Sequence, residues 1–388
     1  MILIHIEPTP SPNSMKITVS EKLPDSIRYT LTKEQEHTAP EPYRSLLAIE
    51  GVRSLYRAGD FIALDRTAKA DWQTILTTVR VVLGDRSAAA AGSEPSSTAP
   101  ASPTSEAFGE VIVKLQHFRG IPLQIRVSAG GEEKRAALPE RFSEAAVKAA
   151  SASPNLIKER SLDDWDTRYG ELSDVLEEIV QELDAAYDDA RLSELVVRAQ
   201  QGPVTEGAQA IAEAARRTFT YEETEQKLQS EDWKERYAAL QQIQPSEETL
   251  PLLVQALQDE QTAIRRLATV YIGDLKSPSV LPYLYDALQD RSAVVRRTAG
   301  DTLSDIGDPL AQDAMIRALG DSNKLVRWRA ARFLYEAGDE RAIPALQAAA
   351  NDPEFEVSMQ ARMALARIEG GQAAEGSVWQ QMTRRNDS

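Results

Sequence analysis

Aspartates at a fixed spacing of 31 residues run through the C-terminal part of the chain, and they constrain its fold more than any other feature. The repeated residues are Asp259, Asp290, Asp321 and Asp352. An aliphatic residue stands five positions after each aspartate, an alanine nine after it, and an isoleucine or leucine thirteen after it. Because these offsets step by four, they lie on one face of an α-helix, with the alanine where a neighbouring helix comes close. A second apolar series predicts a second helix in each unit, through Leu284, Met315 and Leu346.

Units of this kind must stack to be stable. One helical hairpin cannot bury its own apolar face, whereas a series of hairpins forms a continuous core. Segments such as "LQDRSAVVRRTAGDTLSDIGDP" resemble the short HEAT-like repeats of the phycobilisome-lyase type. An irregular earlier copy, "LQSEDWKERYAALQQI", is expected to cap the array, because terminal repeats are usually atypical. The sequence therefore predicts an α-α solenoid over residues 204–388.

Composition excludes several classes of function. None of the 388 residues is cysteine, which excludes disulfides, thiolate metal sites, cysteine nucleophiles and cysteine-held iron–sulfur clusters. The net charge is −16, and no predicted domain is net positive, so nucleic-acid binding is not expected. The first residues lack a signal-peptide pattern, and no stretch approaches the roughly 20 apolar residues of a membrane span. We expect a cytoplasmic protein.

A low-complexity segment divides the chain. Residues 87–106 consist mainly of Ala, Ser, Pro and Thr without hydrophobic periodicity, and this composition predicts a flexible linker. It separates an N-terminal domain, residues 1–86, from a middle domain, residues 107–203. The predicted fold class is multidomain, with two small α+β domains followed by the solenoid of HEAT-like repeats.

The N-terminal domain carries a family resemblance. Alternating segments such as "LIHIEP" and "MKITVS" predict strands, and "DWQTILTTVRVVLG" predicts an amphipathic helix. The runs "EPTPSPNSMK" and "LLAIEGVRSLYRAGDFIAL" resemble the N-terminal domain of Nfu/NifU-type iron–sulfur scaffold proteins. That resemblance implies the fold and a docking role. In that family, a Cys-x-x-Cys pair in a separate C-terminal domain holds the cluster. This chain has no counterpart of that domain or of its cysteines, so no cofactor is expected.

The middle domain is predicted to start with a β-hairpin that turns at Arg119 and Gly120, followed by helices in "PERFSEAAVKAA" and "LSDVLEEIVQELDAAY". His117 is expected on the solvent face of a strand, and the acidic run from Asp163 to Asp166 at a solvated helix start. The order of all three parts resembles the conserved virulence factor C family of Gram-positive bacteria. This resemblance implies an effector of gene expression and virulence traits, and it supplies no catalytic residues.

Arginines recur six positions after the repeat aspartates. Our interpretation is a ladder in which each aspartate caps a helix and each arginine bonds a neighbouring unit's aspartate or carbonyls. The alternative is a row of receptors for carboxylates or phosphates. The ladder residues are Asp259, Asp290 and Asp321 with Arg265, Arg296 and Arg327.

Two other segments are candidates for partner binding. "KLVRWRAARF" concentrates cations around a tryptophan that is expected to be exposed, and such residues often anchor interfaces. The alternative is ordinary helix surface and core. "EPTPSPN" is either a rigid connector or an extended docking element. The candidate contacts are Arg327, Trp328, Arg329, Arg332, Glu7 and Asn13.

These patterns favour a non-enzymatic scaffold or adaptor that binds partner proteins through the solenoid and has a virulence-factor-like regulatory role. No catalytic motif is present and no metal site is expected. The alternative is an accessory factor in iron–sulfur or bilin-lyase-like cofactor maturation, which would dock clients without holding the cluster. The sequence does not identify the partner protein.

Overall fold

The computed structural model describes residues 1–84, 110–202 and 219–371, except for residues 10, 12, 25–26, 68–69, 130–131, 152, 154 and 156. The predicted linker, residues 87–106, lies outside the described residues. The chain divides into two compact units. The first unit is mainly residues 1–110, and the second contains both the rest of the middle domain and nearly all of the repeats.

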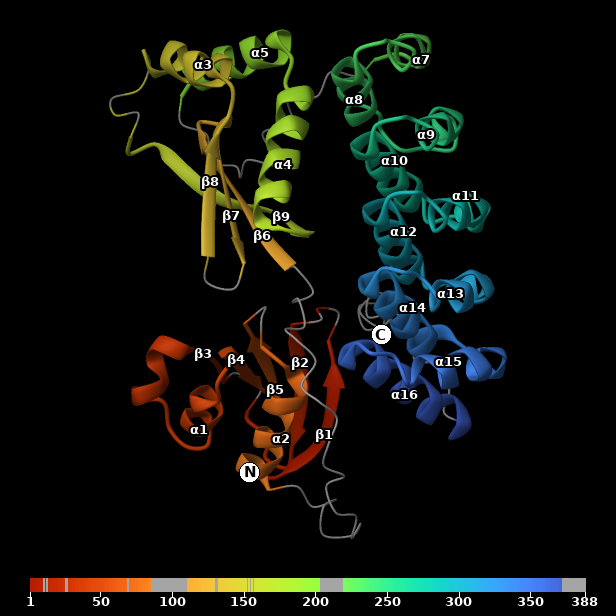
Figure 1. Cartoon of the computed structure of the whole chain (residues 1–388). Coiled ribbons are helices and arrows are strands. Elements are labelled where there is room, and N and C mark those ends of the chain that lie inside the picture. The colour runs from red at the N-terminus through yellow and green to blue at the C-terminus, as the bar shows by residue number, and fades with distance from the viewer. Residues whose placement is uncertain are drawn as a thin grey trace. The chain divides into compact units, whose positions relative to one another are not determined.

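The first unit is built on a five-stranded antiparallel sheet with strand order β1-β2-β5-β4-β3 (Figure 1). Every second residue of β2 faces the core, as the predicted alternation requires, and Trp72 of α2 is fully buried. Asp71 caps α2 by accepting a hydrogen bond from the Thr74 N–H. The elements are β1 (Leu3–Pro8), β2 (Ser14–Val19), β3 (Arg28–Thr32), η1 (Lys33–Thr38), α1 (Tyr43–Ala48), β4 (Val52–Ala58), β5 (Phe61–Arg66) and α2 (Trp72–Leu83).

The second unit begins with a four-stranded sheet of order β8-β7-β6-β9. The β6–β7 hairpin turns at Arg119 and Gly120, both of which have positive φ. The described part of this domain also contains three helices, of which α3 and α4 lie where the sequence predicted them. The elements are β6 (Glu110–Phe118), β7 (Ile121–Ala129), β8 (Glu132–Ala137), α3 (Glu140–Ala150), β9 (Arg160–Tyr169), α4 (Leu172–Ala186) and α5 (Asp189–Gln200).

Two expectations for this domain are wrong. The acidic run from Asp163 to Asp166 lies in β9, because this polar segment pairs with the edge of β6 instead of starting a helix. His117 is buried, with 3% exposure, and does not face solvent. Its Nδ1 accepts a hydrogen bond from the Gly120 N–H, and its Nε2 lies 2.9 Å from Asp163 Oδ2. The neighbouring strand therefore covers the histidine.

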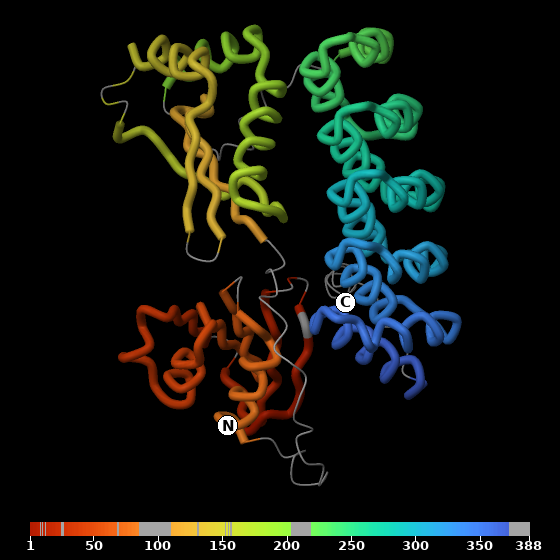
Figure 2. Tube along the Cα trace, viewed as in Figure 1, coloured from red at the N-terminus to blue at the C-terminus, as the bar shows by residue number. Residues whose placement is uncertain are grey.

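The rest of the second unit is the predicted α-α solenoid of HEAT-like repeats, and the stacked hairpins are visible in Figure 2. The close-approach alanines of three successive first helices are fully buried, as their register requires: Ala268, Ala299 and Ala330. Short 3₁₀ turns precede three of the second helices at Pro278–Val280, Pro309–Ala311 and Glu340–Ala342. The helices are α7 (Tyr221–Lys227), α8 (Trp233–Gln241), α9 (Leu250–Ala256), α10 (Thr262–Asp274), α11 (Leu281–Ala287), α12 (Ala293–Ile306), α13 (Gln312–Ala318), α14 (Lys324–Ala337), α15 (Ile343–Ala349) and α16 (Phe355–Glu369). Within the described ranges, no helix has the length and apolar character needed to cross a membrane.

Candidate functional site

The repeat arginines each join two successive units. Arg265 Nε donates to Asp290 Oδ2 at 2.7 Å, and its Nη2 donates to Asp290 Oδ1 at 3.0 Å. Its Nη1 donates to the carbonyl of Asp259, at the start of its own unit, at 2.8 Å. The same Nε–Oδ2 distance of 2.7 Å recurs in three further pairs: Arg236–Asp259, Arg296–Asp321 and Arg327–Asp352.

The ladder aspartates also accept hydrogen bonds from backbone N–H groups two residues later in the chain. Asp290 Oδ1 also accepts a hydrogen bond from the Ser292 N–H, which orders the loop before α12. Burial by itself would raise the pKa of Asp290, but the hydrogen bonds from Arg265 and from the Ser292 N–H outweigh burial and lower the pKa. Because both partners are engaged within the stack, this row of charges serves to hold adjacent repeats in register.

The segment around Trp328 is mostly buried, although its tryptophan was expected at the surface. Trp328 is 2% exposed, so the expectation of an exposed tryptophan is wrong. Its helix, α14, lies inside the array and packs against α12 and α13, which leaves little of its surface open. Arg332 is also buried and pairs with Glu336 at 2.7 Å, while the Arg329 guanidinium lies 5.0 Å from the Trp328 ring. Arg327 is a ladder residue.

The two candidate contacts of the N-terminal domain lie at the β1–β2 hairpin. Glu7 pairs with Lys16 of the neighbouring strand at 3.0 Å. Asn13 is buried and accepts a hydrogen bond from Arg66 Nε at 3.2 Å. A docking role for Glu7 and Asn13 stays a prediction. Two prolines of the same segment, residues 10 and 12, lie outside the described residues.

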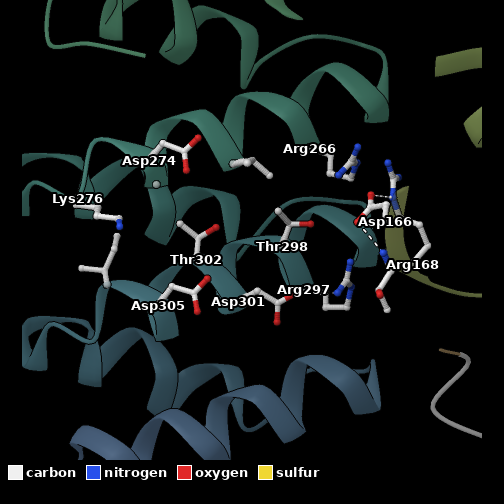
Figure 3. Close-up of a pocket in the computed structure, with 14 residues that line it drawn as sticks. Asp166, Arg168, Arg266, Asp274, Lys276, Arg297, Thr298, Asp301, Thr302 and Asp305 are labelled. Carbon is white, nitrogen blue, oxygen red and sulfur yellow. Dashed lines mark hydrogen bonds and ion pairs between the residues drawn. The ribbon is translucent and has the colours of Figure 1, made fainter. Parts of the chain in front are cut away.

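A polar cavity that the sequence did not predict lies between β9 and the helices α10 and α12. Its volume is about 430 Å³. Figure 3 shows Asp166, Arg168, Arg266 and Arg297 at one end and Asp274, Lys276 and Asp305 at the other, with Thr298, Thr302 and Asp301 between them. The cavity therefore has a cationic end and an acidic end.

A buried carboxylate organises the cationic end. Glu182 of α4 accepts a bidentate pair of hydrogen bonds from Arg168, at 3.2 and 2.7 Å, and a further one from Arg266 Nη2 at 3.2 Å. Burial would raise the pKa of Glu182, but Arg266 and Arg168 more than offset burial and lower the pKa. The Nε of Arg266 is buried and has no hydrogen-bond acceptor among the residues that the structure describes.

Arg297 forms the next part of the cavity wall. Its guanidinium lies 4.5 Å from the Tyr169 ring, and its Nη1 donates to Asp301 Oδ2 at 2.8 Å. Asp301 also pairs with Arg329 Nε at 2.5 Å. Burial lowers the pKa of Arg297, although Asp301 opposes that shift. Arginine side chains held flat and largely dehydrated are suited to binding planar anions.

The acidic end contains two aspartates from successive repeats. Asp274 and Asp305 stand eight residues after Arg266 and Arg297, respectively. Neither carboxylate has a hydrogen bond or ion pair with any other residue that the structure describes. Partial burial raises the pKa of both carboxyl groups. Lys276 opposes the shift at Asp274, and Arg329, followed by Lys276, opposes it at Asp305.

The half of this cavity that the repeats supply could have been recognised from the sequence, because its charged residues recur with the same 31-residue spacing as the ladder. Arginine occurs seven positions and aspartate fifteen positions after the repeat aspartate in two successive units. The other half could not be recognised, because Asp166 and Arg168 reach the cavity from a strand that the sequence did not predict.

Three families of known domains match the chain. Residues 4–89 match "Scaffold protein Nfu/NifU N terminal", and residues 116–196 match "Virulence factor". Two overlapping ranges, 222–304 and 284–366, match "HEAT repeats". These matches follow the order of the parts inferred from the sequence.

Full-length relatives are also found. "Uncharacterized protein YpgR" of Bacillus subtilis is 52% identical over 99% of this chain and 98% of its own length. "Conserved virulence factor C" of Staphylococcus aureus is 44% identical over 99% of this chain and all of its own length. Among solved structures, the complex of CpcE and CpcF of phycocyanin lyase from Nostoc is 24% identical, covering 40% of this chain and 66% of that one, with a TM-score of 0.33.

Proposed function

The chain belongs to the conserved virulence factor C family, and from this premise we propose that it is a non-enzymatic cytoplasmic adaptor that binds a partner protein through its repeats. HEAT repeats support an adaptor-like role, because a solenoid presents an extended surface to partners. The family name supports a regulatory role in virulence traits, which the adaptor would exert through its partner.

The observation that carries the proposal is a second set of repeated arginines, Arg266 and Arg297, which directly follow ladder arginines in the sequence. The ladder arginines are used in stacking, whereas Arg266 and Arg297 point into a cavity and keep unused donors. Charged groups that are partly buried with incomplete pairing are costly to stability, so they are most often found at functional sites. A partner that supplied the missing groups would gain affinity from each of them.

The chemistry of the described side chains supports a non-enzymatic role. None of the described residues that line the cavity is a serine, cysteine or histidine. Elsewhere, Ser161, His117 and Asp163 lie together, and their geometry does not match a catalytic triad. Both Ser161 and Asp163 contact His117 Nε2, while Nδ1 accepts from the Gly120 N–H, whereas a triad places acid and nucleophile on different ring nitrogens.

Site-specific photo-crosslinking in cells that produce the full chain tests the proposal. A photoreactive residue at Asp274, in the cavity, is compared with one at Gln347, an exposed position on α15. We expect a covalent adduct with a partner protein from the Asp274 position and none from Gln347. Absence of any adduct from Asp274 and from Thr302, across the cavity, would overturn the adaptor proposal.

A further inference from the structure

We propose that the cavity between β9 and the helices α10 and α12 binds an extended peptide segment in which an acidic and a basic residue stand four positions apart. This inference rests on the proposed adaptor function and specifies the chemistry of the partner. It follows from the separation of charge in the cavity, from the unused bonding capacity at each end, and from the distance between the ends.

The residues that line the cavity are grouped by sign. Arg168, Arg266 and Arg297 lie at one end with Asp166. Asp274 and Asp305 lie at the other end with Lys276. A ligand that matches both ends therefore carries one negative and one positive group.

The cationic end has free donors for a carboxylate. Among the described residues, Arg266 donates through Nη2 alone, to Glu182, and Arg297 through Nη1 alone, to Asp301. A guanidinium has five N–H groups, and its fork geometry fits the two oxygens of a carboxylate.

The acidic end has free acceptors for a cation. The carboxylates of Asp274 and Asp305 accept no hydrogen bond from the described part of the chain, and they come from equivalent positions of adjacent repeats. A lysine ammonium carries three donors and could contact both carboxylates at once. The raised pKa of each carboxyl group agrees with this assignment, because a bound cation would lower it again.

The distance between the ends sets the spacing in the ligand. Arg297 and Asp305 are eight residues apart on α12, and at a rise of about 1.5 Å per residue their Cα atoms lie about 12 Å apart along the axis. Four residues of extended peptide span about 13 Å and place both side chains on the same face.

The test is isothermal titration calorimetry of the full chain with the probe acetyl-Glu-Thr-Val-Thr-Lys-amide. Control peptides replace Glu by Gln, replace Lys by Gln, or shorten the spacing by one residue so that the charges face opposite sides. The protein variants are Arg297→Gln and Asp305→Asn. Arg291→Gln is the matched control, because Arg291 is an exposed arginine of the same repeat outside the cavity.

We expect the probe to bind and each change of a matched charge to weaken binding roughly tenfold, the equivalent of about 1.4 kcal/mol. Arg297→Gln should weaken the original probe but have little further effect on the probe that lacks Glu. Asp305→Asn should show the same non-additivity with the probe that lacks Lys. Arg291→Gln should leave binding unchanged.

No binding of the probe, additive losses, or equal binding of the shortened peptide would each overturn the proposal. If Arg297→Gln proves unfolded by circular dichroism, the Asp305→Asn arm decides alone, because the Asp305 side chain reaches solvent and its change should not disturb folding. A protein adduct from Asp274 without probe binding would refute the charge pattern while leaving the adaptor function intact. Absence of both the adduct and probe binding would refute both.

Discussion

Helices α10 and α12 pack closely at Gly273, and replacement of this glycine by alanine should destabilise the second unit. A Cβ atom at Gly273 of α10 would lie 2.0 Å from Thr302 Cγ2 of α12 and 3.3 Å from Thr302 Cβ. Non-bonded carbon atoms prefer about 3.5–4.0 Å, so α10 and α12 would have to separate by roughly 1 Å or more. Thr302 has little freedom to move away, because threonine in a helix is restricted to two χ1 rotamers.

The magnitude is a balance of two effects. Overpacking a tight contact costs about 1–3 kcal/mol, and this short distance places Gly273→Ala at the upper end of that range. Alanine is about 1 kcal/mol better than glycine in a helix interior, which offsets part of the cost. The expected net loss is about 2 kcal/mol. In a Thr302→Ser background the Cγ2 atom is gone, and the same change should cost nothing or stabilise slightly.

Hydrogen exchange measured by mass spectrometry on the four members of this cycle is the assay. A loss of about 2 kcal/mol corresponds to roughly 30-fold lower protection of the amides in α10 and α12. Gly320→Ala is the control, because a Cβ there would meet only the Arg317 carbonyl oxygen, at 3.5 Å. Equal losses from Gly273→Ala in both backgrounds would refute the reasoning, as would an equal loss from Gly320→Ala.

Three further predictions concern the same unit. Arg296→Ala removes a mostly buried ladder pair with Asp321 and should cost about 1–3 kcal/mol in urea unfolding, whereas the exposed Arg341→Ala should have little effect; equal costs would contradict the ladder. Burial raises the pKa of Asp305 in the folded state, so its ionisation opposes folding at neutral pH, and Asp305→Asn should raise the melting temperature there. That gain should vanish as the pH falls below the ordinary value of 3.8, and a lower melting temperature at neutral pH would contradict it. Ala299→Leu overpacks a fully buried position, at a cost of about 1–3 kcal/mol, and should reduce hydrogen-exchange protection from α10 to α14; unchanged protection would show that the repeat register is wrong.

The sequence by itself determined the solenoid, because the interactions that build it are periodic. Each first helix meets the next one at a fixed offset, so the positions of Ala268 and Ala299 recur with the repeat and show in the chain as a pattern. The contact between Arg265 and Asp290 follows from the same register. Strands such as β2 and β5 were also predictable, because the alternation of apolar and polar residues is a property of each strand's own sequence.

Tertiary structure alone decided where the polar residues lie. A polar segment has the same appearance in the sequence whether it faces solvent, pairs as a strand or lines a cavity, so β9 was not recognised and His117 was expected at the surface. Trp328 is buried because helices of other repeats cover it, and the sequence around Trp328 does not indicate that they do. The cavity combines β9 with helices about 100 residues later in the chain, and only the packing of the folded domain brings Arg168 beside Arg266.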